Sequence, residues 1–232
     1  MRQVLLCILI LFTGLSGNSQ ETKPLFSEAI AQNLPAYNAE ADQLLRQGDM
    51  EGVKALFQSF VDQQLEGSVM DDFKVEGLSQ DIHSLGEFSK PVFLLTYSAW
   101  CIPSKGEIPA LNRLAEEYGD DIDFVVLYWD NRKMVKKEAK QFSEKINIIY
   151  VDEQKNNGFA TIKNLKHALG LPLNFVMNSD KEILHIGRRL TNSMGITLES
   201  AFEKNYTLLA DNLSSLKMRI SDEIIQEGVA SF

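Results

Sequence analysis

The sequence predicts an α/β fold in which a mixed sheet is flanked by helices, with helical extensions at both ends of the chain. Between residues 92 and 170, apolar runs of strand length alternate with segments of helical periodicity, a pattern typical of parallel strands with helical crossovers. Two further apolar runs, 173–177 and 182–186, are separated by only four residues and therefore predict an antiparallel hairpin. With 232 residues, 44% hydrophobic and 24% charged, the chain can bury one core and carry a small appendage.

The first 19 residues have the pattern of a secretory signal peptide. Arg2 supplies a positive charge, residues 4–12 are an uninterrupted apolar run, and small and polar residues follow as far as Ser19. The apolar run is too short to span a membrane. Cys7 lies inside it after two leucines, which excludes a lipoprotein signal. We therefore expect a secreted or periplasmic protein with no stable membrane insertion.

The cysteine count limits the chemistry. The two cysteines are Cys7 and Cys101, and removal of the signal peptide would leave only Cys101. The mature protein could then form no internal disulfide. In an oxidising compartment a lone cysteine is either buried and inert or available for intermolecular chemistry.

The charge balance bears on the kind of partner. The net charge is −9, and no run of consecutive basic residues is longer than Lys136 with Lys137 or Arg188 with Arg189. Nucleic-acid binding calls for a basic face. We therefore expect no nucleic-acid partner.

Residues 20–70 form a predicted N-terminal helical segment. Apolar positions recur at helical spacing on both sides of residues 47–49, where Asp49 can cap the second helix. Pro35 is expected to break the first helix. This helical pair is either a cover packed on the main domain, which general packing rules favour, or a module that binds a partner.

Residues 71–195 form the predicted main domain, and residues 196–232 form a C-terminal helix. The domain begins with a polar stretch at 71–90 and a buried strand at 92–95. The further elements expected are a helix at 107–118, strands at 122–129 and 148–151, and helices marked by apolar positions from Val135 to Ile146 and from Phe159 to Leu169. The C-terminal helix carries an apolar stripe from Leu198 to Ile224. Its default role is packing on the domain, and pairing with the N-terminal helices or dimerisation are the alternatives.

A cysteine lies in the turn that connects the predicted strand at 92–95 to the predicted helix at 107–118. A thiol at a helix N-terminus lies among unpaired backbone N–H groups and the positive end of the helix dipole, which favours the nucleophilic thiolate. Pro103, four residues before Glu107, suits the first turn of a helix. We therefore predict that the helix begins at Cys101.

Three motifs carry a resemblance to a known family. Trp-Cys-Ile-Pro at 100–103, followed by Lys105, resembles the active-site turn of thioredoxins. Glu-Ile-Pro at 107–109 resembles the E-x-P of the TlpA-type, extracytoplasmic branch of that superfamily, and residues 170–177 resemble the segment that carries its cis-proline. The resemblance covers residues 71–195 and implies a thioredoxin-like domain there, with a short hairpin before the central strand.

Two positions depart from the family pattern. The motif W-C-x-P-C has its second cysteine where this chain has Ser104, and the buried acid of the central strand is replaced by Leu95. A serine cannot resolve a mixed disulfide, because it forms no S–S bond and its alkoxide is inaccessible near neutral pH. What remains is monothiol chemistry: capture of a thiol partner, exchange with a small thiol, or isomerisation in which the substrate supplies the resolving thiol.

The resemblance also assigns roles to residues. The catalytic candidates are Cys101 and Ser104, whose hydroxyl could hydrogen-bond the thiolate. The expected substrate-facing residues are Trp100, Ile102, Pro103, Leu171 and Pro172, and the expected electrostatic tuning residues are Lys105 and Glu107.

Two functions follow from this assignment. The first is thiol–disulfide exchange or mixed-disulfide capture at Cys101, with a thiol- or disulfide-bearing protein or a small thiol as partner. The alternative is a redox-inactive domain that binds a partner polypeptide through a groove between Cys101 and Pro172.

No cofactor or metal is expected. His83, His167 and His185 are isolated in the sequence, so Cys101 has no companion ligands. Thr96 lies five residues before Cys101, whereas the peroxiredoxin motif requires a spacing of three. The Gly-Phe of monothiol glutaredoxins is also absent between Cys101 and Ser104.

Overall fold

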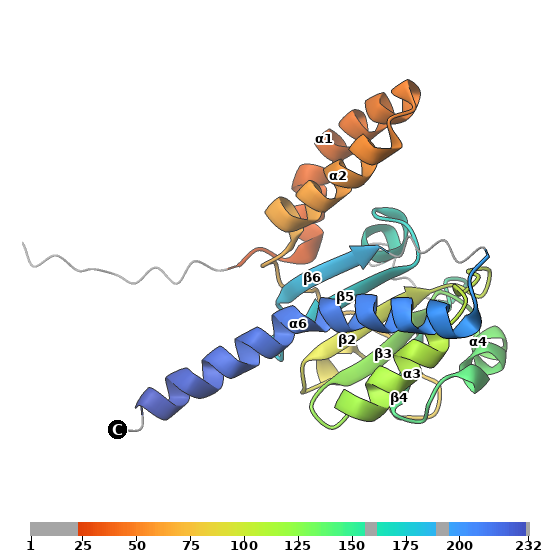
Figure 1. Cartoon of the computed structure of the whole chain (residues 1–232), viewed down its shortest axis with the longest axis vertical. Helices are drawn as coiled ribbons and strands as arrows, with labels where there is room; N and C mark the ends of the chain where they lie inside the picture. Colours follow the sequence, from red (N-terminus) through yellow and green to blue (C-terminus); the bar gives the residue numbers. More distant parts are fainter. Residues whose placement is uncertain (1–22, 156–161, 189–194, 231–232) are drawn as a thin grey trace, which may run out of the picture.

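The structure, a computed structural model, describes residues 23–155, 162–188 and 195–230, with the side chains of the last helix described in its first half only (Figure 1). The predicted signal peptide lies outside the described residues. Within the described ranges, no helix is both long enough and apolar enough to cross a membrane.

A six-stranded mixed sheet forms the centre of the domain. Its strands are β1 (Glu76–Gly77), β2 (Val92–Tyr97), β3 (Asp123–Tyr128), β4 (Ile146–Tyr150), β5 (Leu173–Met177) and β6 (Ile183–Arg188), in the spatial order β1-β4-β3-β2-β5-β6. The pairs β2–β3 and β3–β4 are parallel, whereas β1, β5 and β6 pair antiparallel with their neighbours. The predicted α/β class and the predicted antiparallel hairpin are confirmed.

Both faces of the sheet are covered. Successive side chains of a strand point to opposite sides, so each strand contributes to two separate cores. Phe93, Leu95 and Tyr97 of β2 face one core, together with α3 (Glu107–Tyr118) and α6 (Leu198–Ala230). Val92 and Leu94 face the other core, together with the N-terminal segment. Figure 1 shows α6 crossing the first face, beside α3, and its second half extending past the sheet.

The stretch before β2 forms the short hairpin that the resemblance implied. Lys74 and Ser84 form an antiparallel bridge, and Val75 donates its backbone N–H to the carbonyl of His83 at 2.8 Å. A 3-10 turn at Leu85–Glu87 then leads towards β2.

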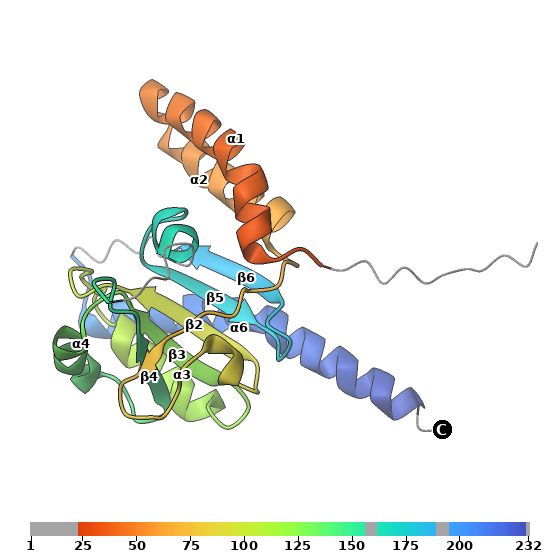
Figure 2. The same ribbon diagram turned by 180° about the vertical axis from the view of Figure 1, so that it is seen from behind.

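The N-terminal segment is a helical hairpin that projects from the domain (Figures 1 and 2). It consists of α1 (Phe26–Gln47) and α2 (Met50–Phe60), followed by a π-helical turn at Val61–Leu65. Asp49 caps α2 as predicted, accepting a hydrogen bond from the N–H of Gly52 at 2.8 Å. The predicted break at Pro35 is wrong. Pro35 lies inside α1, where its exposed position leaves the unpaired carbonyl one turn earlier open to water.

Only the base of this hairpin packs on the domain. Its buried side chains there are Phe26, Ala29, Ile30, Phe57, Phe60 and Val61. Tyr37 stacks on Phe60 with ring centroids 4.5 Å apart, and beyond this pair only Ala41 is buried in the distal part of α1. The base is thus the predicted cover, whereas a partner-binding role for the tip stays a prediction.

Between β3 and β5 the elements differ most from prediction. The helix after β3 is α4 (Arg132–Glu138), which gives way to a 3-10 turn at Ala139–Gln141. Ile146 belongs to β4 instead, because it pairs with Phe124 of β3. A helix was also predicted from Phe159 to Leu169. The part of it that the structure describes is a π-helical turn at Ile162–His167, and Phe159 lies outside the described residues.

The C-terminal helix is continuous as predicted. Leu209, Leu213 and Leu216 are buried against the sheet, which confirms the default of packing for this part of the helix. Leu198, also on the predicted apolar stripe, is 58% exposed and is the first residue of α6.

Candidate functional site

The candidate site is the loop between β2 and α3, residues 98–106, which we call the Cys101 turn. This loop is not helical at Cys101: α3 begins at Glu107, with Gly106 at its N-cap in a left-handed conformation (φ +80°). The N–H of Cys101 donates to the carbonyl of Ser98 at 2.8 Å, which closes a tight turn. The prediction that the helix begins at the cysteine is therefore wrong, and Pro103 lies before the helix rather than in its first turn.

A carboxylate takes the place that was predicted for the thiol. Glu107, the first residue of α3, is 2% exposed. Its side chain accepts hydrogen bonds from the hydroxyl of Tyr97 at 2.6 Å and from the N–H of Ser104 at 2.8 Å. The positive end of the α3 dipole thus stabilises the carboxylate of Glu107.

Ser104 connects this carboxylate to the C-terminal helix. Its hydroxyl lies 3.2 Å from Oε2 of Glu107 and 3.1 Å from Oδ1 of Asn205, so its single hydrogen can be donated to either oxygen or shared between them. Asn205, on α6, is 3% exposed and donates to the carbonyls of Lys105 at 2.9 Å and Ala201 at 2.7 Å. The predicted hydrogen bond from Ser104 to the thiolate stays a prediction.

The first turns of α6 lie directly on the Cys101 turn. The ammonium of Lys105 donates to the carbonyl of Ile196 at 2.8 Å. A Cβ atom added to Gly106 would lie 2.5 Å from the backbone nitrogen of Phe202. Position 106 must therefore be a glycine for this close approach as well as for its backbone conformation.

Asn205 is the site residue that the sequence analysis missed. It lies three residues after Phe202 and four before Leu209, so it occupies a position on the apolar stripe of its own helix. A polar side chain at a core-facing position requires a hydrogen-bond partner. The polar residue within the apolar stripe was therefore the sequence signal from which Asn205 could have been identified.

Cys101 is half-buried and packs against the core on the α6 side of the sheet. Its neighbours in the sequence are exposed: Trp100 by 67% and Ile102 by 89%. Burial, and then the negative charges of Glu138, Asp130 and Cys101, raise the pKa of the Tyr128 phenol.

Asp130 fixes the start of the turn. Its carboxylate accepts hydrogen bonds from the N–H of Ala99 at 2.6 Å and from the hydroxyl of Ser98 at 3.1 Å. Because Asp130 follows β3, the end of β3 and the Cys101 turn are held together.

The Leu171–Pro172 peptide bond is cis, as the resemblance implied. The next residue, Leu173, pairs with Thr96, and the Thr96 hydroxyl lies 3.2 Å from both the N–H and the carbonyl of Leu173. Since Cys101 follows Thr96 by five residues, the Cys101 turn and the proline segment leave the sheet from one paired position. The groove between Cys101 and Pro172 and its substrate-facing roles remain predictions.

The histidines lie apart from this site. His83 contacts Asp81 at 2.9 Å and His185 contacts Glu66 at 3.2 Å. Within the described part of the chain, no group of three or more potential ligands could hold a metal ion.

Comparison with known proteins gives one curated relative and several solved structures. No protein-family model matches the chain. The thioredoxin-like protein YneN of Bacillus subtilis is 28% identical over 86 residues, which are 37% of this chain and 51% of that protein. The chain thus matches about half the length of this relative.

Several solved structures are similar to this chain at low sequence identity. They include a thiol:disulfide interchange protein from a Bacteroides species (TM-score 0.47, 17% identity, 62% of this chain and 87% of that chain). The others are the thioredoxin domain of a thiol-disulfide oxidoreductase from Bacteroides vulgatus (0.47, 16%, 63% and 96%) and StoA from Bacillus subtilis (0.40, 19%, 57% and 95%).

The sheet order, the helices on both of its faces and the similarity to YneN agree with one another. The chain has a thioredoxin-like fold, and the curated protein to which it is similar is itself named a thioredoxin-like protein.

Proposed function

We propose that this protein is an extracytoplasmic thioredoxin-like protein whose redox chemistry is confined to the single thiol of Cys101. The observation that carries the proposal is the contrast between positions 101 and 104. Cys101 lies between the exposed side chains of Trp100 and Ile102, whereas the hydroxyl of Ser104 is held by Glu107 and Asn205. The sequence pattern of residues 1–19 supports the location.

The reaction needs a disulfide-bearing polypeptide as the partner. The Cys101 thiolate attacks one partner sulfur, a Cys101–partner S–S bond forms, the partner's own S–S bond breaks, and its second sulfur leaves as a thiolate. A second thiol, from the same partner or a small thiol, then attacks the mixed disulfide and releases Cys101 as a thiolate. When the attacking thiol belongs to the same partner, the partner's disulfide is rearranged without net oxidation. Ser104 takes no part in either step.

A second candidate function is binding without redox chemistry. It is favoured by the start of α3 at Glu107, because the helix dipole then stabilises a carboxylate and lies six residues beyond the thiol. In this case Trp100 and Ile102 would contact a partner polypeptide, and Cys101 would serve only as a packed side chain.

The pH dependence of Cys101 alkylation separates the two candidates. For the first function, we expect Cys101 to titrate below about 8.5, the value of a free thiol, and to form a one-to-one mixed disulfide with a neutral small disulfide. The readout is the intact mass after quenching. The Cys101→Ser variant corrects for any signal from Cys7.

The Ser104→Cys variant provides a second comparison. With two thiols in the turn, the added sulfur can displace the captured group, so the mixed disulfide should be lost and replaced by an internal disulfide. Slow alkylation of the wild-type protein with an apparent pKa at or above about 8.5, and no mixed disulfide, would exclude the first function and leave the binding function.

A further inference from the structure

A cluster of cations lies on α4 in a protein that is acidic overall. Residues 132–140 contain five basic side chains and one acidic side chain, against a net charge of −9 for the chain. Arg132 donates to the carbonyl of Leu78 at 2.9 Å, whereas the four lysines are exposed. We call these lysines, Lys133, Lys136, Lys137 and Lys140, the α4 basic surface.

These lysines are hardly neutralised by the protein itself. Lys137 lies 3.9 Å from Glu138. Across the part of the chain that the structure describes, no ion pair involves Lys133, Lys136 or Lys140. The sequence analysis missed the cluster because it counted only consecutive basic residues, whereas these are spaced along a helix and the 3-10 turn that follows it.

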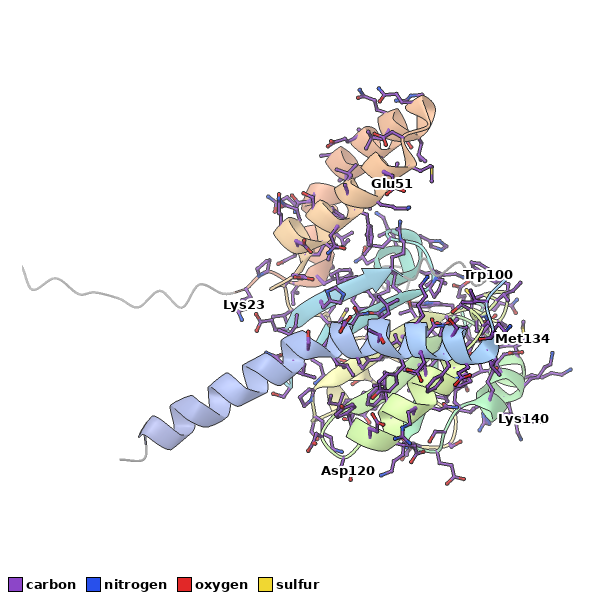
Figure 3. The ribbon with its side chains drawn as sticks, viewed as in Figure 1. Lys23, Glu51, Trp100, Asp120, Met134 and Lys140 are labelled. Carbon is purple, nitrogen blue, oxygen red and sulfur yellow. The ribbon has the colours of Figure 1, made fainter. Side chains whose placement is uncertain are left out.

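The α4 basic surface is joined to the Cys101 turn. Asp130, which accepts hydrogen bonds from Ala99 and Ser98 of the turn, directly precedes Asn131, the N-cap residue of α4. Figure 3 shows Trp100, Met134 and Lys140 along the same end of the molecule.

Large apolar side chains are exposed in the same region. Trp100 is 67% exposed, Ile102 is 89% exposed and Met134 on α4 is 44% exposed. Exposed apolar side chains bordered by polar ones are typical of a protein interaction site. Cations beside them add a preference for a partner of opposite charge.

We propose that the α4 basic surface docks an acidic segment of the polypeptide whose sulfur reacts at Cys101, while Trp100, Ile102 and Met134 contact apolar residues next to that sulfur. The identity of the reacting sulfur rests on the proposed function, and the docking itself rests on charge and exposure. A chain of net charge −9 repels an acidic partner over most of its surface, so attraction at α4 steers the encounter to the Cys101 turn. An anionic membrane would also attract lysines, but two of the three apolar side chains, Trp100 and Ile102, flank the cysteine in the sequence, which favours a polypeptide with a reactive sulfur.

The docking can be tested without any sulfur chemistry. Two labelled peptides are compared by fluorescence anisotropy, each with the apolar sequence Leu-Ser-Leu, one flanked by four glutamates and the other by four lysines. The protein variants are Lys133→Glu/Lys136→Glu and, as a control with the same change of charge, Arg46→Glu/Lys54→Glu on the exposed hairpin.

We expect the glutamate peptide to bind and the lysine peptide not to bind. Affinity for the glutamate peptide should fall about tenfold in the α4 variant and by a similar factor at high salt. The hairpin control should match the wild type. Equal binding of both peptides, equal losses in both variants, or binding to anionic phosphatidylglycerol vesicles without binding to the glutamate peptide would overturn the proposal.

The same peptides with cysteine in place of serine, activated as a disulfide with a neutral small thiol, test the proposed function separately. If the serine peptide binds through the lysines but the cysteine peptide forms no mixed disulfide, the proposed function fails and the docking surface stands. If the cysteine peptides react at equal rates whatever their charge, the docking proposal fails and the thiol function stands.

Discussion

The hydroxyl of Ser104 donates a hydrogen bond to the side-chain oxygen of Asn205 at 3.1 Å, across 101 residues of sequence. The side chain of Ser104 thus connects the Cys101 turn to the C-terminal helix. Asn205 also binds the carbonyl of Lys105, so two successive residues of the Cys101 turn are held by one side chain of α6. Ser104 therefore has a structural role in holding the turn against α6.

Replacing Asn205 by alanine should loosen the Cys101 turn. The Asn205→Ala variant leaves the carbonyl of Lys105 without its Asn205 partner, whereas the hydroxyl of Ser104 keeps its bond to Glu107. We expect the free energy of unfolding to fall by about 2 kcal/mol, since each buried polar group left unsatisfied costs about 1–3 kcal/mol. Urea denaturation measures this loss, and hydrogen–deuterium exchange of residues 98–106 should become faster.

Asn33→Ala is the matched control for this substitution. Asn33 makes the same kind of bond to the carbonyl four residues earlier, that of Ala29 at 2.9 Å, but lies on α1 away from the turn. Its loss should cost no more than about 0.5–1.5 kcal/mol and should leave exchange in the turn unchanged. Equal effects of the two variants would show that α6 does not hold the turn.

Substitutions at Gly106 and Gly170 can distinguish the cost of backbone strain from the cost of a clash with α6. Both have φ +80°, which costs a non-glycine residue about 1–2 kcal/mol. A Cβ at Gly170 would meet nothing within 4 Å, whereas one at Gly106 would lie 2.5 Å from the backbone nitrogen of Phe202. We expect Gly170→Ala to lower the free energy of unfolding by about 1–2 kcal/mol and Gly106→Ala by more than about 3 kcal/mol.

The comparison of the two alanine variants is made by urea denaturation at neutral pH. A similar loss in both would mean that α6 can move away from the turn at little cost. The close approach of α6 would then be of no importance for stability.

The strands β3 and β5 could be predicted from the sequence because their side chains are buried on both faces of the sheet. The apolar run at 173–177 predicts β5 (Leu173–Met177) to the residue, and the apolar run at 122–129 predicts β3 to within one residue at each end. The amphipathic segment at 107–118 also predicts α3 to the residue, but the placing of Cys101 and Pro103 in its first turn was wrong. That they lie before the helix follows from the left-handed conformation of Gly106 and the burial of Glu107, which the sequence pattern does not reveal.

The contact between Ser104 and Asn205 could not be predicted for a related reason. It joins the Cys101 turn to α6, two segments that only the packed structure brings together, and Asn205 by itself is one polar residue in an apolar stripe. The basic cluster on α4 was within reach of the sequence, because a count over nine residues reveals it.

Glu107 and Tyr97 should be energetically coupled. The Tyr97 hydroxyl donates to the buried carboxylate at 2.6 Å, and the amide of a Glu107→Gln variant would bring a second donor into this site. We expect Glu107→Gln to cost about 2–3 kcal/mol and Tyr97→Phe about 1 kcal/mol. The double variant should cost less than the sum by about 1 kcal/mol or more.

An exposed pair of the same chemistry provides the reference for this double-mutant cycle. The hydroxyl of Tyr206 donates to Glu117 at 2.5 Å on the surface. Its coupling energy should stay within about 0.5 kcal/mol, because water replaces the lost partner. If the buried pair were coupled no more strongly than the exposed pair, the hydrogen bond between Tyr97 and Glu107 would not hold the start of α3.

Stability should fall at high pH through Tyr150. Burial, and then the hydrogen bond to Glu76 at 2.5 Å, raise the pKa of Tyr150 from 10.0 to about 12. The folded state therefore keeps this proton at a pH where the unfolded state has lost it. The resulting stability is fully present below pH 10.0 and is lost between pH 10.0 and about 12.

The Tyr150→Phe variant removes this titration. It should lose stability less steeply than the wild type between pH 10.0 and about 12, as measured by urea denaturation at intervals of pH. Glu76→Gln keeps the burial but removes the carboxylate, so it should lower the pKa of Tyr150 and reduce the loss in part. Tyr128 and Tyr206, whose pKa values are also raised, remain in both variants and account for the loss that persists. Parallel pH profiles for the wild type and Tyr150→Phe would mean that Tyr150 titrates at the same pH in the folded and unfolded states, contrary to its burial beside Glu76.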